Sequence, residues 1–245
     1  MTKKTTKKTD YKIDLKELLD AGCHFGHQAR RWNPKMKQYI YVKRDGVHIF
    51  DLEKTAAHLS AAMEKVRDLV AEGKEVVFVG TKRQASSIVE EEAKKVGAPY
   101  VAIRWLGGTV TNWEQIKKGI DKLNEYEEKK AKGEFKKYTK KENLLIAREM
   151  EKLDRFLGGL KTLTQIPEAI FVVDIKKEVA AVKEAKIRGL ELIAMVDSNA
   201  DPDVVTDVIP ANDDAVRSIK LVVAKMAQAY SDGKGLKGKK PKAKS

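Results

Sequence analysis

The stretch from residue 104 to residue 160 constrains the fold more than any other, because about fifty residues pass there without a strand signal. Apolar side chains recur at three- and four-residue steps, the spacing of a helix that packs against another helix. Two such seams are present, each about two heptads long and too short to be stable alone in water. We therefore expect one antiparallel coiled-coil hairpin over residues 109–158, whose arms bury each other's seams. The first seam holds Trp113, Ile116, Ile120 and Leu123, and the second holds Ile146, Met150, Leu153 and Leu157.

The expected turn between the two arms is strongly basic. Residues 129–141 hold seven lysines and one glutamate, a net charge of +6, whereas the two arms together carry −3. A nearly neutral shank with a basic tip is typical of an arm that contacts a polyanion, although lysines also solvate turns that bind nothing. Phosphate contacts are expected from Lys129, Lys130, Lys136, Lys137 and Lys140.

Positive charge is gathered in four segments of the chain. Residues 1–12, 28–44, 129–141 and 231–245 carry +4, +6, +6 and +5, while the whole chain of 245 residues carries +13. The remainder is therefore acidic, with a net charge of −8. This segregation predicts a large anionic partner that is contacted at several places. The first and last segments have little apolar surface to bury, so we expect them to be disordered tails.

Cysteine usage and hydropathy indicate the compartment. Cys23 is the only cysteine, so no internal disulfide can form and a reducing compartment is expected. No apolar run reaches the length of a membrane span, and the basic N-terminus lacks the apolar region of a secretory signal. We expect a cytoplasmic protein with no membrane contact.

The remaining residues, 13–108 and 159–230, alternate between apolar runs and amphipathic helical patterns. Runs that are apolar throughout are typical of strands buried on both faces. The alternation predicts an α/β domain, a parallel sheet with helices on both faces, into which the helical hairpin is inserted. Strands are expected at 75–79, 100–103, 169–173 and 192–196, with a weaker one at 204–209. Helices are expected at 14–21, from 51 to 73, up to 96, at 178–188 and from 212 to 230. A loop at 23–36 and a β-hairpin at 39–50 are expected in the first part of the domain.

Basic and aromatic residues alternate between positions 30 and 44. Arginine binds phosphate through two parallel hydrogen bonds, and Trp or Tyr can stack on exposed bases. An ordinary hairpin with buried aromatic side chains would have the same composition, so both interpretations stay open. The residues expected to bind RNA here are Arg30, Arg31, Trp32, Lys35, Lys37, Lys43 and Arg44.

A second candidate phosphate site is the strand-to-helix turn at residues 80–83. It lacks the glycine spacing of a phosphate-binding loop and of a dinucleotide fingerprint. We expect Lys82 and Arg83 to contact a nucleic-acid backbone instead. Arg104 is expected to do the same near the base of the hairpin, where Trp105 is expected to pack.

Two clusters have the residue types of a metal site. Cys23, His24 and His27 offer zinc ligands, but a closed zinc site needs four and no second cluster exists. The acids at 197–203 follow a buried strand and could hold magnesium, yet Asp and Asn are also common in turns, so a structural loop is favoured. No catalytic set or cofactor fingerprint accompanies either cluster, so we expect no metal, no cofactor, no small-molecule substrate and no enzymatic activity.

Thirteen short motifs run through residues 13–230 in a consistent order: Gly22–Gln28, Arg31–Met36, Val47–Ile49, Asp51–Thr55, Phe78–Lys82, Arg104–Gly108, Thr111–Trp113, Glu151–Leu153, Leu157–Gly159, Val196–Asn199, Asp201–Asp203, Ile209–Pro210 and Asn212–Ala215. Together they resemble the bacterial ribosomal protein S2 family of the small subunit. The resemblance implies a flavodoxin-like domain with a protruding coiled coil. It also implies a structural protein that binds small-subunit ribosomal RNA, bridges the head and body of the subunit, contacts neighbouring ribosomal proteins and helps ribosomal protein S1 to dock.

Departures from the family pattern are few. Cys23 stands where an apolar residue is expected, which indicates a buried position rather than a metal ligand. Residues 175–178 are less acidic than in the family, and the two tails are particular to this chain. From the residues alone, two other functions stay open: a nucleotide- or phosphosugar-binding enzyme that uses residues 80–83 and 197–203, and a protein-interaction module whose hairpin grips a partner helix.

Overall fold

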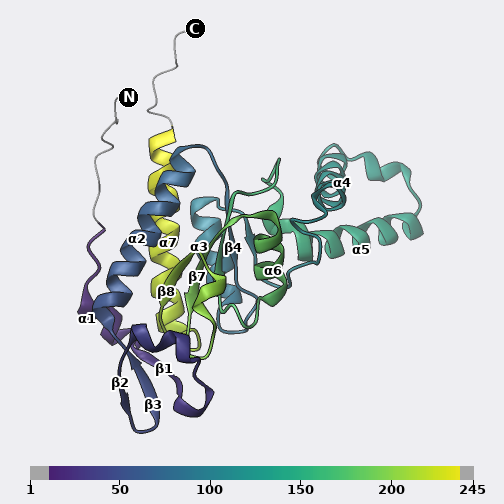
Figure 1. Ribbon diagram of the computed structural model, residues 1–245. Coiled ribbons are helices and arrows are strands. Elements are labelled where there is room, and N and C mark those ends of the chain that lie inside the picture. The colour runs from purple at the N-terminus through teal and green to yellow at the C-terminus, as the bar shows by residue number, and fades with distance from the viewer. Residues whose placement is uncertain (1–10, 238–245) are drawn as a thin grey trace, which may run out of the picture.

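A five-stranded parallel sheet forms the centre of the computed structural model, which describes residues 11–237 (Figure 1). The strands lie in the order β5-β4-β6-β7-β8, and every neighbouring pair is parallel. Counted along the chain within this sheet, the order is 2-1-3-4-5, which is that of flavodoxin-like folds. The predicted α/β class is confirmed. The strands are β4 (Val76–Val79), β5 (Tyr100–Val101), β6 (Ala169–Val173), β7 (Glu191–Val196) and β8 (Asp207–Pro210).

Side chains alternate between the two faces of this sheet, and each face has its own core. On one face Val76 and Phe78 pack with the helices α2, α3 and α7, and on the other Val77 and Val79 pack with α6 and the base of the helical hairpin. Because both faces are buried, the strands are apolar throughout, as the sequence predicts. The helices are α2 (Leu52–Ala71), α3 (Ser86–Val96), α6 (Val179–Arg188) and α7 (Val216–Lys237).

A small antiparallel sheet in the order β1-β3-β2 lies below the parallel sheet in Figure 1. The predicted β-hairpin is confirmed: Asp45 and Gly46 at its turn both have positive φ, which Asp-Gly turns favour. The strand β1 lies where the sequence predicts a loop, and its pairing with β3 is irregular, with a register shift between Phe25 and Gln28. The elements of this part are α1 (Leu15–Asp20), β1 (Phe25–Gln28), the 3₁₀ turns η1 (Ala29–Arg31) and η2 (Pro34–Tyr39), β2 (Ile40–Arg44) and β3 (Val47–Phe50).

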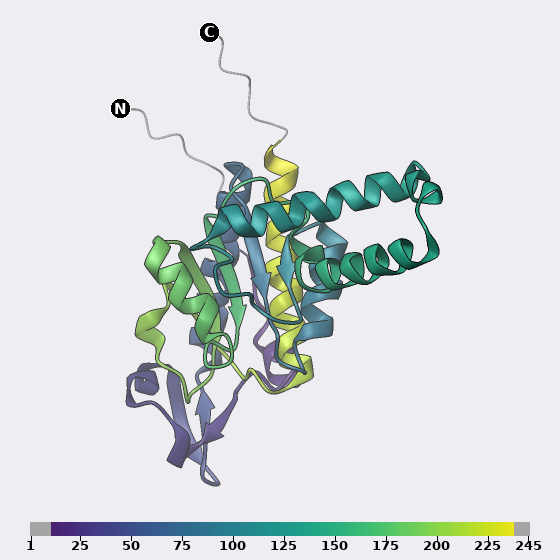
Figure 2. The ribbon, with the colours of Figure 1, turned by 90° about the vertical axis from the view of Figure 1, so that its right-hand side faces the viewer.

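Two long helices, α4 (Trp113–Ala131) and α5 (Lys140–Leu157), form an arm that projects from the sheet domain (Figure 2). They are joined by a 3₁₀ turn, η3 (Glu134–Lys137), and α5 begins with a capping box between Thr139 and Glu142. The helices themselves are therefore where the sequence predicts them.

The seam between these two helices is closed only at its base. Ile116, Ile120 and Leu123 of α4 are buried, but on α5 only Leu157 is buried, whereas Ile146 and Met150 are partly exposed. Beyond Leu123 the next seam positions of α4 carry Glu127 and Lys130, which offer no apolar surface for α5 to cover. The expected coiled coil along the full length of the arm is therefore not present.

A buried carboxylate fixes the segment that leads into the arm. Glu184 of α6 accepts five hydrogen bonds from this segment, and its side chain is 8% exposed. Burial acts to raise the pKa of Glu184, but the backbone hydrogen bonds outweigh it and hold the pKa below its ordinary value. The carboxylate thus stays ionised and fixes the base of the arm. The donors are Trp105 Nε1, the backbone N–H groups of Gly108, Val110 and Thr111, and Thr111 Oγ1, at 2.8–3.2 Å.

At both ends, the folded structure extends further into the predicted tails than the sequence indicates. Tyr11 donates a hydrogen bond of 2.9 Å to Asp232, and α7 continues to Lys237, seven residues past its expected end. At Gly233 a Cβ atom would lie 2.6 Å from the carbonyl oxygen of Arg67, so glycine lets α7 pack closely on α2. The rest of the expected tails, 1–10 and 238–245, lies outside the described residues. No helix formed by residues 11–237 has an apolar stretch long enough to cross a membrane.

Replacing Glu184 with glutamine should lower the free energy of unfolding by roughly 2–4 kcal/mol, because an amide nitrogen would face backbone donors that now share a carboxylate. Urea denaturation followed by circular dichroism measures the change. Lys183→Gln, at the exposed neighbouring position, is the control and should change the value by less than about 0.5 kcal/mol. Equal stability of Glu184→Gln and the control would show that Glu184 does not fix the base of the arm.

Candidate nucleic-acid interface

Six of the predicted RNA-binding cations lie on the small antiparallel sheet and its 3₁₀ turns. All six are exposed. Arg44 lies 3.8 Å from Asp45, but both side chains are more than four-fifths exposed, so this pair is loose. The structure thus brings these positive charges together on one small unit. They are Arg30 and Arg31 in η1, Lys35 and Lys37 in η2, and Lys43 and Arg44 in β2.

The aromatic residues of this unit are placed differently from the expectation. Trp32 is only partly exposed and stacks on His48, with ring centroids 4.7 Å apart and an interplanar angle of 27°. Tyr39 is buried and meets the edge of His58. Tyr41, at 76% exposure, and Phe25, at 48%, are the aromatic side chains of this unit that are exposed to solvent. Stacking on a base is therefore available to Tyr41 rather than to the rings of Trp32 or Tyr39.

Lys35 is paired with carboxylates of the same molecule. Its ammonium lies 2.8 Å from Asp201 and 2.7 Å from Asp203. Asp201 also accepts a hydrogen bond from the backbone N–H of Asp203 at the start of a short 3₁₀ turn (Pro202–Val204). The acidic loop considered as a magnesium site therefore binds a lysine and stabilises its own turn. Within residues 11–237, no group of three or more His, Cys, Asp or Glu side chains has an arrangement that could hold a metal ion.

Lys82 is also engaged within the protein. Its ammonium contacts Asp174 at 3.0 Å, Asp213 at 2.7 Å and Asp214 at 2.6 Å, and the side chain is 14% exposed. Although burial opposes the charged form, these carboxylates raise the pKa of Lys82 well above its ordinary value. The expectation that Lys82 contacts an RNA phosphate does not fit this position, whereas Arg83 next to it is exposed.

His27 pairs with Asp214, which also contacts Lys82, so it belongs to one charged cluster with these residues. The cluster consists of His27, Lys82, Asp174, Asp197, Asp213 and Asp214. The Nδ1 of His27 lies 3.0 Å from Asp197 and its Nε2 lies 3.3 Å from Asp214, a geometry in which a doubly protonated ring donates to both carboxylates. The hydrogen bond to Asp197 raises the pKa of His27, and burial opposes this shift. The sequence suggested His27 as a possible zinc ligand, and its position opposite two aspartates emerges only from the fold.

Burial and the repulsion between neighbouring carboxylates affect the pKa of an aspartate in the cluster. Burial, followed by the neighbouring charges of Asp197 and Asp174, raises the pKa of Asp213 to about 7. Asp197 accepts hydrogen bonds from the backbone and hydroxyl groups of Ser198, and the Ser198 hydroxyl in turn accepts one from the backbone N–H of His27. The cluster therefore joins β1, the carboxyl ends of β4, β6 and β7, and the segment before α7.

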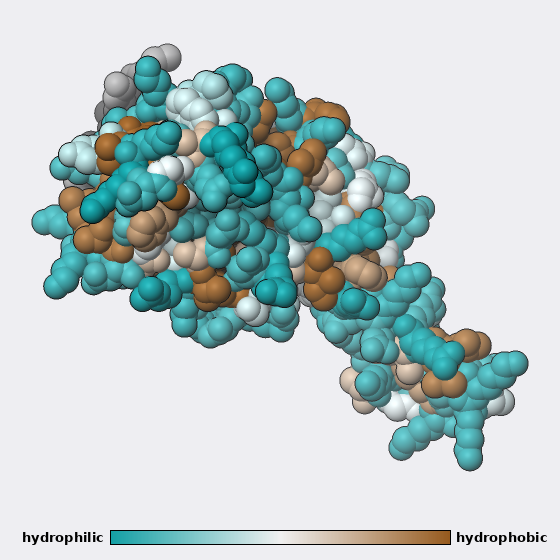
Figure 3. All heavy atoms as spheres, turned by 90° about the horizontal axis from the view of Figure 1, so that it is seen from below, coloured by the Kyte–Doolittle hydropathy of each residue, from teal (hydrophilic) through white to brown (hydrophobic). Residues whose placement is uncertain are grey.

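The turn of the arm carries a second set of cations. Lys129 pairs with Glu125 at 2.5 Å. By contrast, four of the predicted lysines there form no ion pair with any residue between 11 and 237, and Lys137 lies 5.8 Å from the ring of Tyr138. The surface seen from below is largely hydrophilic, and the arm stands clear of the body (Figure 3). The unpaired lysines are Lys130, Lys136, Lys137 and Lys140, and all four are exposed.

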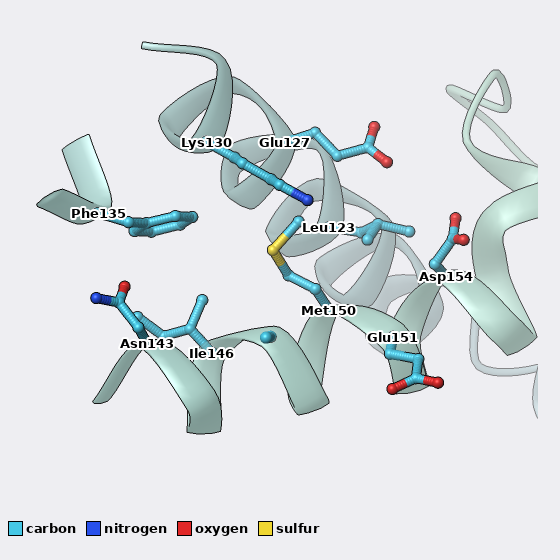
Figure 4. Close-up of a pocket in the computed structure, with 10 residues that line it drawn as sticks. Leu123, Glu127, Lys130, Phe135, Asn143, Ile146, Met150, Glu151 and Asp154 are labelled. Carbon is cyan, nitrogen blue, oxygen red and sulfur yellow. The ribbon is translucent and has the colours of Figure 1, made fainter. Parts of the chain in front are cut away.

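A groove of about 510 Å³ opens between α4 and α5 near this turn (Figure 4). Its floor is apolar, with Phe135 from η3 and Ile146 and Met150 from α5 directed into it, and Glu127 and Lys130 lie at its rim. The groove exists because the seam is open there. Sequence reasoning missed it, although polar residues at the later seam positions of α4 were a visible signal.

The structure also shows how exposed Cys23 and the residues at the base of the arm are. Cys23 is fully buried, which confirms the expectation drawn from its place in the sequence. Trp105 is buried at the base of the arm, as expected, while Arg104 beside it is exposed and forms no ion pair with the described residues.

The fold and these surfaces define an α/β scaffold protein with a helical insertion and with exposed cations at two ends. A family model described as Ribosomal protein S2 matches residues 18–233. The chain belongs to the ribosomal protein S2 family. It is therefore a ribosomal protein, a structural component of the translation machinery, and not an enzyme.

Individual relatives are similar in sequence to this chain along almost its whole length. Proteins called "Small ribosomal subunit protein uS2" from Roseiflexus sp. and Synechocystis sp. are 49% and 50% identical to this chain, over 90% and 91% of its length. These matches cover 84% and 82% of the two relatives. The protein of that name from Chlorobium phaeovibrioides is 49% identical over 92% of this chain and 88% of its own.

Replacing His27 with glutamine should destabilise the protein by about 1–3 kcal/mol near pH 6, because two carboxylates lose their donor. His27 has a raised pKa in the folded state, so its contribution is complete below the unfolded value near 6.5 and is lost as the pH rises through the folded value. The difference between wild type and variant should therefore shrink towards pH 9.

Urea denaturation at both pH values tests this prediction. His58→Gln is the control, because the ring contact of His58 is with the aromatic ring of Tyr39 rather than with a carboxylate, and near pH 6 this variant should lower the free energy of unfolding less than His27→Gln does. A difference for His27→Gln that does not change with pH would mean that His27 is not held as a cation between Asp197 and Asp214.

Proposed function

We propose that the chain is a structural component of the small ribosomal subunit and binds small-subunit ribosomal RNA in the cytoplasm through exposed cations at its two ends. The observation that carries this proposal is the set of exposed lysines at the turn of the arm, Lys130, Lys136, Lys137 and Lys140. Cations elsewhere, such as Lys82 and Lys35, are already paired with aspartates. Those at the turn have no competing carboxylate within hydrogen-bonding distance among the described residues.

The chemistry favours contacts to the RNA backbone. Lysines that neutralise phosphates release condensed counterions, and such contacts fix position without reading sequence. Residues expected to contribute beyond the turn are those whose charge is exposed. These are Arg30, Arg31, Lys37, Lys43, Arg44, Arg83 and Arg104. Lys129 and Lys35 should contribute less, because each is paired with a carboxylate of the same molecule. Lys82 should not contribute, because its ammonium lies among the aspartates of the charged cluster.

The shape of the protein supports a bridging role. The small antiparallel sheet and the turn of the arm lie at opposite ends of the molecule (Figures 1 and 2). Two separate RNA segments can therefore be contacted at once. This agrees with a position between the head and the body of the subunit.

A protein neighbour fits the groove between α4 and α5. Its apolar floor is exposed, although such surface is normally covered in a stable assembly. We assign this groove to the docking of ribosomal protein S1 or another neighbouring ribosomal protein. A helix with apolar residues at three- and four-residue spacing is the segment such a groove accepts.

Changing Lys130, Lys136, Lys137 and Lys140 together to glutamine should weaken binding to small-subunit ribosomal RNA. The slope of log affinity against log salt concentration should fall by about 0.7–0.9 for each phosphate that the variant no longer neutralises. Filter binding between low and moderate salt measures the slope, and sucrose-gradient sedimentation of cell extract shows whether the variant still travels with the small subunit.

The matched control replaces four exposed or partly exposed lysines of the sheet domain, Lys74, Lys94, Lys95 and Lys183. It removes the same charge from the body, so a specific interface predicts a smaller change in slope. Equal slopes for the two variants would mean that only total charge matters. Full binding by the tip variant would favour the protein-interaction alternative.

Met150→Glu should weaken association with ribosomal protein S1 by at least about tenfold, because a carboxylate in an apolar groove cannot be desolvated cheaply. Surface plasmon resonance with the purified partner measures the affinity, and circular dichroism checks that α5 is intact. Leu145→Glu is the control, since Leu145 is 55% exposed and lies outside the groove. An equal decrease in affinity for both variants would place the docking surface elsewhere.

A further inference from the structure

A concave site of about 630 Å³ lies where the strands β4, β5 and β6 end. Strand order reverses here, since β5 and β6 lie on opposite sides of β4. In open α/β sheets this is where ligands bind, and the volume is within the range of small-ligand sites. We call this site the switch-point crevice. It is separate from the groove of the arm and from the small antiparallel sheet.

The charges that face the switch-point crevice are of two kinds. Asp174 and Lys82 both line it and lie 3.0 Å apart, and the ammonium of Lys82 also contacts Asp213 and Asp214, so these groups are already engaged with one another. Arg83 and Lys177 also line it, are exposed and form no ion pair with any residue from 11 to 237. The crevice therefore presents a guanidinium and an ammonium to a ligand, a combination that binds phosphate through charge-assisted hydrogen bonds.

Glu178, which follows Lys177 in the chain, does not cancel this charge. Glu178 is 3% exposed, and its carboxylate accepts hydrogen bonds from the backbone N–H and the hydroxyl of Thr81 at 2.7 and 2.6 Å. It is turned into the protein rather than towards the opening. An anion can thus approach Arg83 and Lys177 without meeting an exposed carboxylate that is not already paired.

The opposite wall offers apolar surface. Ala102 and Ile103 follow β5, and the side chain of Ile103 is 48% exposed, unusual for an isoleucine beside a buried sheet. A flat apolar group such as a nucleobase would cover it. Gln84 and Ser86 add an amide and a hydroxyl that can meet polar edges of the same group.

We propose that the switch-point crevice binds a single nucleoside phosphate unit, with the phosphate on Arg83 and Lys177 and the base against Ile103. The assignment rests on the proposed RNA-binding function, under which the unit is one unpaired nucleotide of ribosomal RNA. A free mononucleotide has the same chemistry, and the experiment separates the two sources.

Isothermal titration calorimetry of the full chain with adenosine 5′-monophosphate tests the site, with adenosine and inorganic phosphate as partial ligands. The mononucleotide should bind at least about tenfold more tightly than either part, since it uses both walls. Arg83→Gln with Lys177→Gln should weaken it by at least about tenfold. Lys176→Gln is the matched control: it removes a neighbouring exposed lysine that does not line the crevice and should change affinity less than about twofold.

A single-stranded hexaadenylate that displaces the mononucleotide identifies RNA as the source, while failure to displace it identifies a free nucleotide; both support the site. The proposal is overturned if wild type does not bind the mononucleotide at millimolar concentration, or if Lys176→Gln weakens binding as much as the double variant. Filter binding of the same preparations to ribosomal RNA keeps the two proposals apart. Intact ribosomal RNA binding with no mononucleotide binding rejects only the crevice, whereas loss of both rejects the wider function.

Discussion

The balance of buried charge at the carboxyl ends of the parallel strands determines how the parts of this protein fit together. Asp174 follows β6, Asp197 follows β7 and Asp213 precedes α7, and their side chains are 13%, 1% and 3% exposed. Like charges taken out of water destabilise a fold unless cations offset them. Lys82 and His27 provide that offset from two distant parts of the sequence. The same requirement therefore holds the small antiparallel sheet, the strand ends and the start of α7 in one arrangement.

This requirement separates the cations of the chain into two populations that look alike in the sequence. Lys82 and Arg83 are adjacent, yet one ammonium lies among three carboxylates and the other cation faces solvent. Lys35 and Lys37 differ in the same way, since only Lys35 meets Asp201 and Asp203. Only a cation without a nearby carboxylate gains fully from replacing counterions on a polyanion. The net charge of +13 therefore describes the attraction to RNA less well than the positions of the unpaired side chains do.

Much of the fold could be predicted because burial on both faces of a parallel sheet demands apolar runs, and β4, β6 and β7 have them. The strand β1 could not, since Phe25–Gln28 has no apolar alternation and is held by pairing with β3 and by Ser198 far along the chain. The predicted end of α7 falls too early because glycine usually weakens a helix, whereas the missing Cβ of Gly233 allows close packing on α2. At the interface, composition indicated which segments are basic. It could not indicate that Lys82 is engaged with three carboxylates, because its partners come from other segments of the chain.

In the arm, too, some residues stabilise the fold while others leave surface exposed to solvent. At its base Glu184 takes up five hydrogen bonds, and Ile116, Ile120 and Leu157 join the core beneath the sheet, so the arm leaves the domain in a fixed direction. Towards the turn, Glu127 and Lys130 replace the apolar residues that would close the seam. A hairpin whose only role was to be stable would continue that seam. Polar residues at these positions give up packing between the helices, and in return they leave an apolar groove and unpaired lysines exposed where the arm extends furthest from the sheet.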